Sequence, residues 1–129
     1  MKQLILVLLS VILFSCSPSA DHLVDHHFEY VPVVSVEVPE FFVLNEVHQI
    51  KVKYALPNGC YAYYSHDYVY QGETREVTTI AIVNDEAACT QAIIEGEYTI
   101  NVQARQQEVY TFKFWQGEGE YLTVIIPVI

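Results

Sequence analysis

The most enzyme-like group of residues in the chain is Ser65-His66-Asp67, whose three residue types together form the relay of serine hydrolases. The surrounding residues 60–70 are rich in tyrosine and typical of a β-strand. Neighbouring side chains on a strand point to opposite faces, so Ser65 and Asp67 lie on one side and His66 on the other. A relay among these three is excluded, and the sequence has no phosphate-binding glycine loop or nucleophile elbow. We expect no catalytic residues and no cofactor.

Histidines near the N-terminus have one spacing that zinc ligands use. His22 and His26 are four residues apart, which would place them on one face of a helix, and His27 follows. However, residues 16–27 are small, polar and Pro-containing, a composition that stays unfolded and would lose entropy on binding a metal. The acidic residues further along are scattered without the spacing of a calcium loop. We therefore expect no bound metal.

The segment 61–70 contains five tyrosines, more than one face of a core can use. Alternation places Tyr64, Tyr68 and Tyr70 on one face of the strand, and Tyr61 and Tyr63 on the other. Some phenols must then reach solvent or a partner, and tyrosine is enriched at interfaces. Tyr61, Tyr63, Tyr68 and Tyr70 are therefore candidate contacts for a protein or glycan. Aromatic pairing across neighbouring strands, which would only stabilise the sheet, is the alternative.

Trp115 is the fifth candidate contact residue. In a regular strand Trp115 lies on the same face as Thr111 and Lys113, and Phe112 and Phe114 lie on the other face. Its side chain then points outward, beside a hairpin loop at 116–120. A bulge or a neighbouring sheet edge would bury it instead.

The charge of the chain excludes one class of partner. Its 129 residues contain 16 acidic and 6 basic side chains, giving a formal net charge of −10. Nucleic-acid binding depends on Lys and Arg contacts to phosphates, so we expect no nucleic-acid partner.

The N-terminus carries an export signal. Lys2 precedes an apolar run from Leu4 to Phe14, which is too short to span a bilayer core of about 30 Å and is typical of a signal peptide. The next residues, Leu13-Phe14-Ser15-Cys16, resemble the lipobox of bacterial lipoproteins. The resemblance implies cleavage after residue 15 and acylation of Cys16, with palmitate-type chains as the membrane anchor. An ordinary secretory signal is the alternative.

The resemblance also implies a location. The protein would be anchored in the bacterial cell envelope, with the outer membrane favoured over the inner one, and its periplasmic or surface orientation stays open. Residues 16–27 would be a flexible tether, and residues 28–129 the folded domain.

The folded part has the two-residue periodicity of β-strands. Seven segments alternate or are rich in β-branched and aromatic residues, with turn signals between them: 30–38, 50–56, 60–70, 76–83, 98–103, 110–114 and 121–128. Only 85–93 has the composition of a short helix. We predict an all-β fold, a single antiparallel sandwich of Ig-like size, with a small barrel as the alternative.

Two cysteines remain once Cys16 is set aside. Outside the cytoplasm, Cys60 and Cys89 would form a disulfide between the start of the third strand and the segment after the fourth. Neither has a basic neighbour that would lower its pKa, which argues against a catalytic thiol.

These features predict a function only in outline. The domain resembles small Ig-like lipoproteins, which implies a lipid-anchored module that binds a protein or glycan without catalysis. A peptidase inhibitor that presents loops from a similar sandwich is the alternative.

Overall fold

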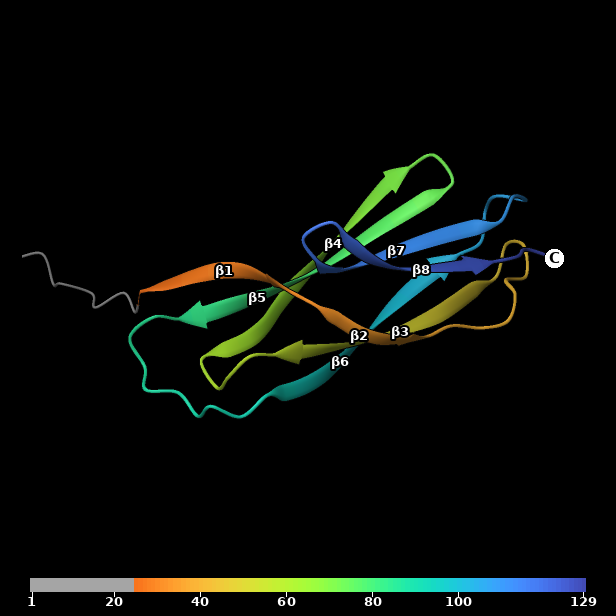
Figure 1. Cartoon of the computed structure of the whole chain (residues 1–129). Helices are drawn as coiled ribbons and strands as arrows, with labels where there is room; N and C mark the ends of the chain where they lie inside the picture. Colours follow the sequence, from red (N-terminus) through yellow and green to blue (C-terminus); the bar gives the residue numbers. More distant parts are fainter. Residues whose placement is uncertain (1–24) are drawn as a thin grey trace, which may run out of the picture.

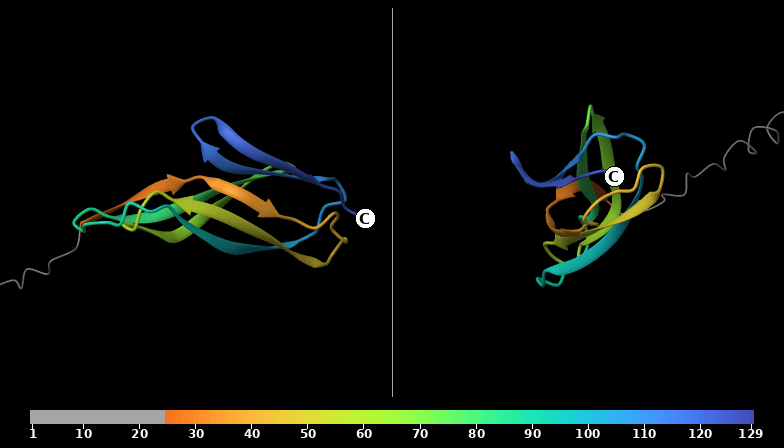
Figure 2. Two further views of the ribbon diagram at one scale, coloured as in Figure 1. Left: turned by 60° about the horizontal axis from the view of Figure 1, so that its bottom comes forward. Right: turned by 90° about the vertical axis from the view of Figure 1, so that its right-hand side faces the viewer.

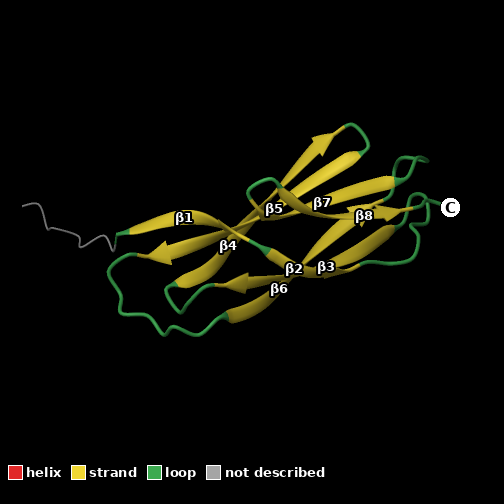
Figure 3. Ribbon diagram, in the orientation of Figure 1, coloured by secondary structure: helices red, strands yellow, loops and turns green. Residues whose placement is uncertain are grey.

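The computed structural model describes residues 25–129, and this part of the chain consists of strands and loops without a helix (Figure 3). The prediction of an all-β domain is confirmed. The eight strands are β1 (His26–Val31), β2 (Val33–Glu37), β3 (Val47–Leu56), β4 (Tyr61–Gln71), β5 (Thr74–Asn84), β6 (Ile94–Gln103), β7 (Tyr110–Gly117) and β8 (Glu120–Ile126).

The strands form two sheets packed face to face (Figures 1 and 2). The larger sheet has β5 at its centre, with β4 on one edge of β5 and both β1 and β7 on the other, and β8 pairs with β7. The smaller sheet has the order β2-β3-β6. All pairs are antiparallel except β5 with β7. The molecule is therefore a sandwich, and the barrel alternative is wrong.

The first strand differs from its prediction because Pro32 divides it. Val31 pairs with Thr79 in the larger sheet, whereas Val33 pairs with Tyr54 in the smaller one. Proline has no backbone N–H to donate to a ladder, so the chain changes sheets at this residue. This crossing turns the seven expected strands into eight, and β1 begins at His26, two residues before the expected domain boundary.

β5 supplies the middle of the core. Its side chains alternate regularly between buried and half-buried, and Val77, Thr79 and Ala81 are fully buried on the face that meets the smaller sheet. Phe112 and Phe114 of β7 and Ile50 and Val52 of β3 pack in the same core. At the Thr74 end of β5 the inward position is occupied by Arg75.

The two ends of the sandwich are different. At the end where β1 begins, Cys60 and Cys89 are joined by a disulfide, which confirms the predicted pairing. At the other end the loop 38–46 is held against the C-terminus: Phe42 is buried, its N–H donates to the Pro127 carbonyl at 2.8 Å, and it forms a bridge with Val128.

The signal peptide at 1–15, Cys16 and most of the predicted tether lie outside the described residues. Within residues 25–129, no helix is long and apolar enough to cross a membrane.

The disulfide yields a test of stability. Replacing Cys60 and Cys89 together by Ser should lower the free energy of unfolding by about 3.5 kcal/mol, because the bond closes a loop of 29 residues in the unfolded chain. Urea unfolding measures the difference, and oxidised wild-type protein treated with a reductant serves as the matched control. Equal stability of the oxidised and reduced proteins would contradict the expected contribution.

Candidate binding site

A bulge in β4 decides where its tyrosines point. The pairing of β4 with β5 passes from Tyr63–Ala81 directly to Ser65–Ile80, so Tyr64 is the extra residue. An extra residue resets the alternation. Tyr61, Tyr63, Tyr68 and Tyr70 therefore all face the smaller sheet, opposite the inward residues of β5, and Tyr64 alone takes the outer face. The predicted division into Tyr64, Tyr68 and Tyr70 against Tyr61 and Tyr63 is wrong for this reason.

The tyrosines nearer to the disulfide are engaged within the domain. The Tyr61 hydroxyl donates to the Glu29 carboxylate. The Tyr63 ring stacks against the rings of Tyr54 and Tyr98, with centroids 5.5 and 5.1 Å away, and its hydroxyl lies 2.8 Å from His66 Nδ1. Aromatic packing of this kind closes the edge of the sandwich between β4 and β6.

Beyond His66 the same edge is open. A cleft of about 410 Å³ lies there between β4 and β5 of one sheet and β6 of the other, and we call it the arginine cleft. Its lining residues are His66, Tyr68, Tyr70, Arg75, Ile100, Asn101, Val102, Gln103, Arg105 and Tyr110. Tyr68 and Tyr70, two of the predicted contacts, thus belong to a concave site, while Tyr61 and Tyr63 lie outside its lining.

Arg75 is the least expected residue of the cleft, because it is only 7% exposed. Its Nη1 donates to the carbonyls of Gly72 at 2.7 Å and Thr74 at 3.3 Å, and its Nη2 donates to Gln106 Oε1 at 3.0 Å. Its guanidinium carbon lies 4.4 Å from the Tyr70 ring centre and 5.3 Å from that of Tyr110. These ring contacts favour a cation.

The charge of Arg75 is nevertheless incompletely satisfied. Within residues 25–129 no carboxylate forms an ion pair with it, and its Nε is buried without a hydrogen-bond partner. Leaving a buried donor unpaired costs about 1–3 kcal/mol. A core selected only for stability would place an apolar residue at this position.

Arg105 lines the cleft from the loop after β6. Its Nε and Nη2 both donate to Gln103 Oε1, at 3.0 and 2.7 Å, and its backbone N–H donates to the Tyr110 hydroxyl at 3.0 Å. Arg75 and Arg105 are the two arginines of the chain. An acidic protein therefore concentrates both guanidinium groups in one concave site, and such a site attracts anions.

Two further titratable groups of the cleft, Tyr68 and His66, are neutral near pH 7. Burial raises the pKa of Tyr68 to about 12, with a further increase from Tyr70 that Arg75 partly offsets. Burial lowers the pKa of His66 below its ordinary value of 6.5, against a smaller opposing effect of Asp67. The cleft thus carries the positive charge of the arginines, surrounded by phenols that can donate and accept hydrogen bonds.

Trp115 lies on a different surface, the outer face of the larger sheet. Its ring meets Tyr30 edge-on at 5.6 Å, and Phe28 packs on Tyr64 at 4.6 Å. A shallow hollow is lined by Phe28, Glu29, Tyr30, Tyr64 and Ile80. The outward position predicted for Trp115 agrees with this arrangement, but the structure does not bring it together with the tyrosines of the cleft.

Ser65, His66 and Asp67 form no relay among the described residues. Ser65 and Asp67 pair with Ile80 and Thr78 on the outer face, whereas His66 pairs with Thr79 on the inner one. Within residues 25–129 no group of three or more His, Cys, Asp and Glu side chains could hold a metal ion.

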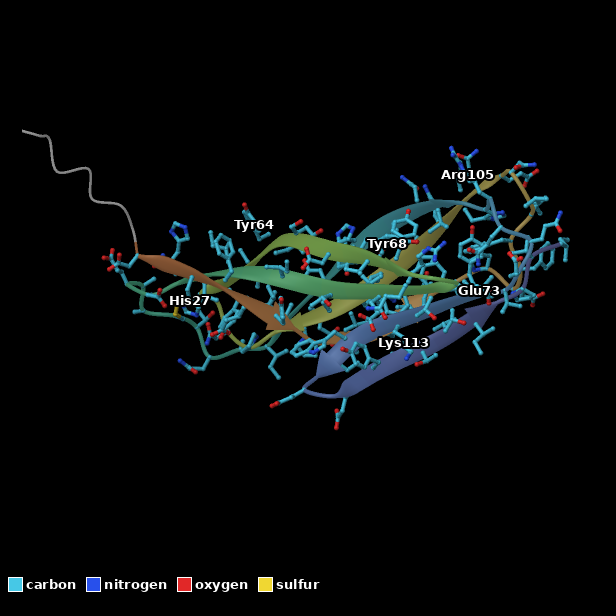
Figure 4. The ribbon with its side chains drawn as sticks, turned by 90° about the horizontal axis from the view of Figure 1, so that it is seen from above. His27, Tyr64, Tyr68, Glu73, Arg105 and Lys113 are labelled. Carbon is cyan, nitrogen blue, oxygen red and sulfur yellow. A yellow bond between two sulfur atoms is a disulfide. The ribbon has the colours of Figure 1, made fainter. Side chains whose placement is uncertain are left out.

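Sequence reasoning missed both arginines, although a signal for one was present. The alternation of Val77, Thr79, Ala81 and Val83 extends backward to Arg75, so Arg75 shares their face. Arg105 lies in a loop, where no periodicity places it. Figure 4 shows Tyr68 on β4 towards the end that carries Arg105 and Glu73, and Tyr64 towards the end that carries His27.

The comparisons with known proteins concern this same part of the chain. A family model described as the ORF11 beta-sandwich domain matches residues 50–125, which include every lining residue of the arginine cleft. No curated protein and no solved structure matches the chain.

The pKa values of His27 and His66 should be shifted in opposite directions from the ordinary value. His27 has its pKa raised by hydrogen bonds to Asp85 and Glu29, at 2.6 and 2.8 Å, so we expect it above 6.5, with His66 below. A raised pKa stabilises the fold below about pH 6.5, and that contribution is lost as the pH rises through the folded value. Side-chain NMR titration measures both pKa values. Asp85→Asn should lower the pKa of His27 and leave the pKa of His66 unchanged. Equal pKa values for the two histidines would refute the assignment.

Proposed function

The chain belongs to the ORF11 beta-sandwich domain family, and we propose that this member is a non-enzymatic binding module anchored by lipid on Cys16. The arginine cleft is its ligand site. The observation that carries the proposal is that Arg75 and Arg105 line the same cleft of about 410 Å³. This volume is within the usual range of small-ligand sites.

The position of the cleft supports its presentation to a partner. β1 begins at the disulfide end, whereas Tyr70, Arg75 and Arg105 lie towards the opposite end (Figures 1 and 4). β5 alone spans about 33 Å between these ends, at about 3.3 Å per residue. A lipid on Cys16, nine residues before Asp25, would therefore be attached at the end of the domain opposite the cleft.

The anchor itself rests on the resemblance of Leu13–Cys16 to a lipobox. We place the protein in a bacterial envelope, with the outer membrane favoured. Two or three acyl chains give stable membrane binding, where a single chain would be marginal. The acidic domain is repelled by anionic headgroups, so the acyl chains must supply the attachment.

The loops at the far end argue against the alternative of a peptidase inhibitor. An inhibitor of this kind presents loops that project from the sandwich. Here the loop 38–46 is tied to the C-terminal residues through Phe42. It is also bonded to the loop after β6: the Asn45 N–H donates to the Ala104 carbonyl at 2.6 Å, and the Ala104 N–H donates to the Glu46 carbonyl at 3.0 Å. These contacts use the backbone that an inhibitory loop would offer to a peptidase.

The anchor can be tested by fractionation. The Cys16→Ala protein should leave the membrane fraction, because no acyl chain can be attached, while wild-type protein should remain there and leave it only with detergent. A Ser15→Ala variant, which keeps a small residue before the cysteine, is the matched control and should stay in membranes. An unchanged distribution of the Cys16→Ala protein would contradict lipid anchoring.

The binding role can be tested by comparing cleft and surface variants. We expect immobilised wild-type protein to retain a component of envelope extract that Tyr70→Ala protein does not retain. The control variant is Tyr121→Ala, which removes an exposed tyrosine of the β7–β8 hairpin, outside the cleft. It should retain the component as wild type does. Equal retention by all three proteins would contradict a role for the cleft.

A further inference from the structure

We propose that the arginine cleft binds a sugar acid, that is, a small saccharide unit that carries one carboxylate. This proposal rests on the proposed function and names the class of ligand for the same site. Three features carry it: the charge of the cleft, the unused donors of Arg75, and the polar and aromatic groups around them.

The charge selects an anion of limited size. Arg75 and Arg105 both line the cleft, and within residues 25–129 neither forms an ion pair with a carboxylate, whereas Lys53 of the smaller sheet is paired with Glu37 at 3.3 Å. The chain as a whole has a net charge of −10, so a long polyanion extending beyond the cleft would be repelled by the surrounding surface. A compact ligand with one negative charge would fit within the cleft, where the two arginines are the charged lining residues, and would avoid the acidic surface around it.

The hydrogen bonds of Arg75 leave room for that anion. A guanidinium has five N–H donors. Those of Arg75 reach the Gly72 and Thr74 carbonyls and Gln106 Oε1, and the group also interacts with the Tyr68 hydroxyl. All of these partners are uncharged, and the buried Nε has no hydrogen-bond partner. The guanidinium of Arg105 likewise donates to the neutral amide oxygen of Gln103, and within residues 25–129 it forms no ion pair. A carboxylate accepts two parallel hydrogen bonds from a guanidinium, and neither arginine has yet made this strong contact.

The remaining groups fit a hydroxylated ring. Tyr70 is 69% exposed, and Arg75 lies against its ring, so part of the phenol surface is open to stack on the C–H face of a sugar. Asn101 and Gln103 are exposed and line the β6 side. Gln103 Oε1 already accepts from Arg105, so the Asn101 amide and the Gln103 NH2 group are the ones left to pair with ring hydroxyls. Tyr68 stays protonated at neutral pH and offers a further hydroxyl. A simple fatty or aliphatic acid would leave these polar groups unpaired.

The test uses three matched probes on the full-length protein in detergent: glucuronate, glucose and acetate. Glucuronate and glucose differ in the carboxylate, and acetate lacks the ring. We expect glucuronate, titrated to about 10 mM, to shift the backbone NMR signals of Tyr70, Arg75 and Arg105, and to bind at least about tenfold more tightly than glucose or acetate.

Matched variants locate the binding. Arg105→Gln and Tyr70→Ala change exposed residues and should each weaken glucuronate binding about tenfold or more. Arg105→Gln should leave the melting temperature unchanged, whereas Tyr70→Ala also removes a ring contact of Arg75 and should lower it slightly. Lys113→Gln removes the same charge as Arg105→Gln but from the outer face of the larger sheet, and it should bind as wild type does (Figure 4).

Several results would overturn the ligand class. They are the absence of NMR shifts with glucuronate, an affinity for glucose equal to that for glucuronate, and tighter binding of acetate than of glucuronate. An effect of Lys113→Gln equal to that of Arg105→Gln would also overturn it. If glucuronate fails while Tyr70→Ala still abolishes retention of an envelope component, the binding module stands and the sugar acid is wrong. If both experiments fail, the proposed function fails as well.

Discussion

Every second side chain of β5 must face the smaller sheet, and the rest of the structure depends on this constraint. β5 pairs with β4 along one edge and with β1 and β7 along the other. The register of these three strands is therefore set by their pairing with β5. Val77, Thr79, Ala81 and Val83 satisfy the constraint by packing in the core. Arg75 is subject to it as well, and its side chain lines the cleft.

Much of the fold follows from local sequence pattern. The alternation of Ile50, Val52 and Tyr54 with lysines predicts β3, and the inward residues of β5 are read in the same way. The error at Pro32 arose because a proline is compatible both with an edge strand and with a crossing between sheets, and only the tertiary structure distinguishes them. The start of β6 at Ile94 was missed because its first four residues include Gly96 and two glutamates, which disfavour strand prediction.

The site was less predictable than the fold, for physical reasons. Four of the five candidate contacts lie on β4, but the bulge at Tyr64 moved two of them to the other face, and no residue type in that segment signals a bulge. The cleft also joins residues that are far apart along the chain, such as Tyr70 and Arg105. Pairing across two sheets depends on how the sheets are stacked, which two-residue periodicity does not determine.

The central claim is that Arg75 is retained for binding at some cost to the stability of the fold. The free energy of unfolding of Arg75→Met protein, measured in urea without ligand, tests this most directly, since methionine keeps the aliphatic packing and removes the buried charge. The account predicts stability equal to or greater than that of wild type. A loss of about 2 kcal/mol or more would show that the guanidinium is a structural element, and would contradict the account.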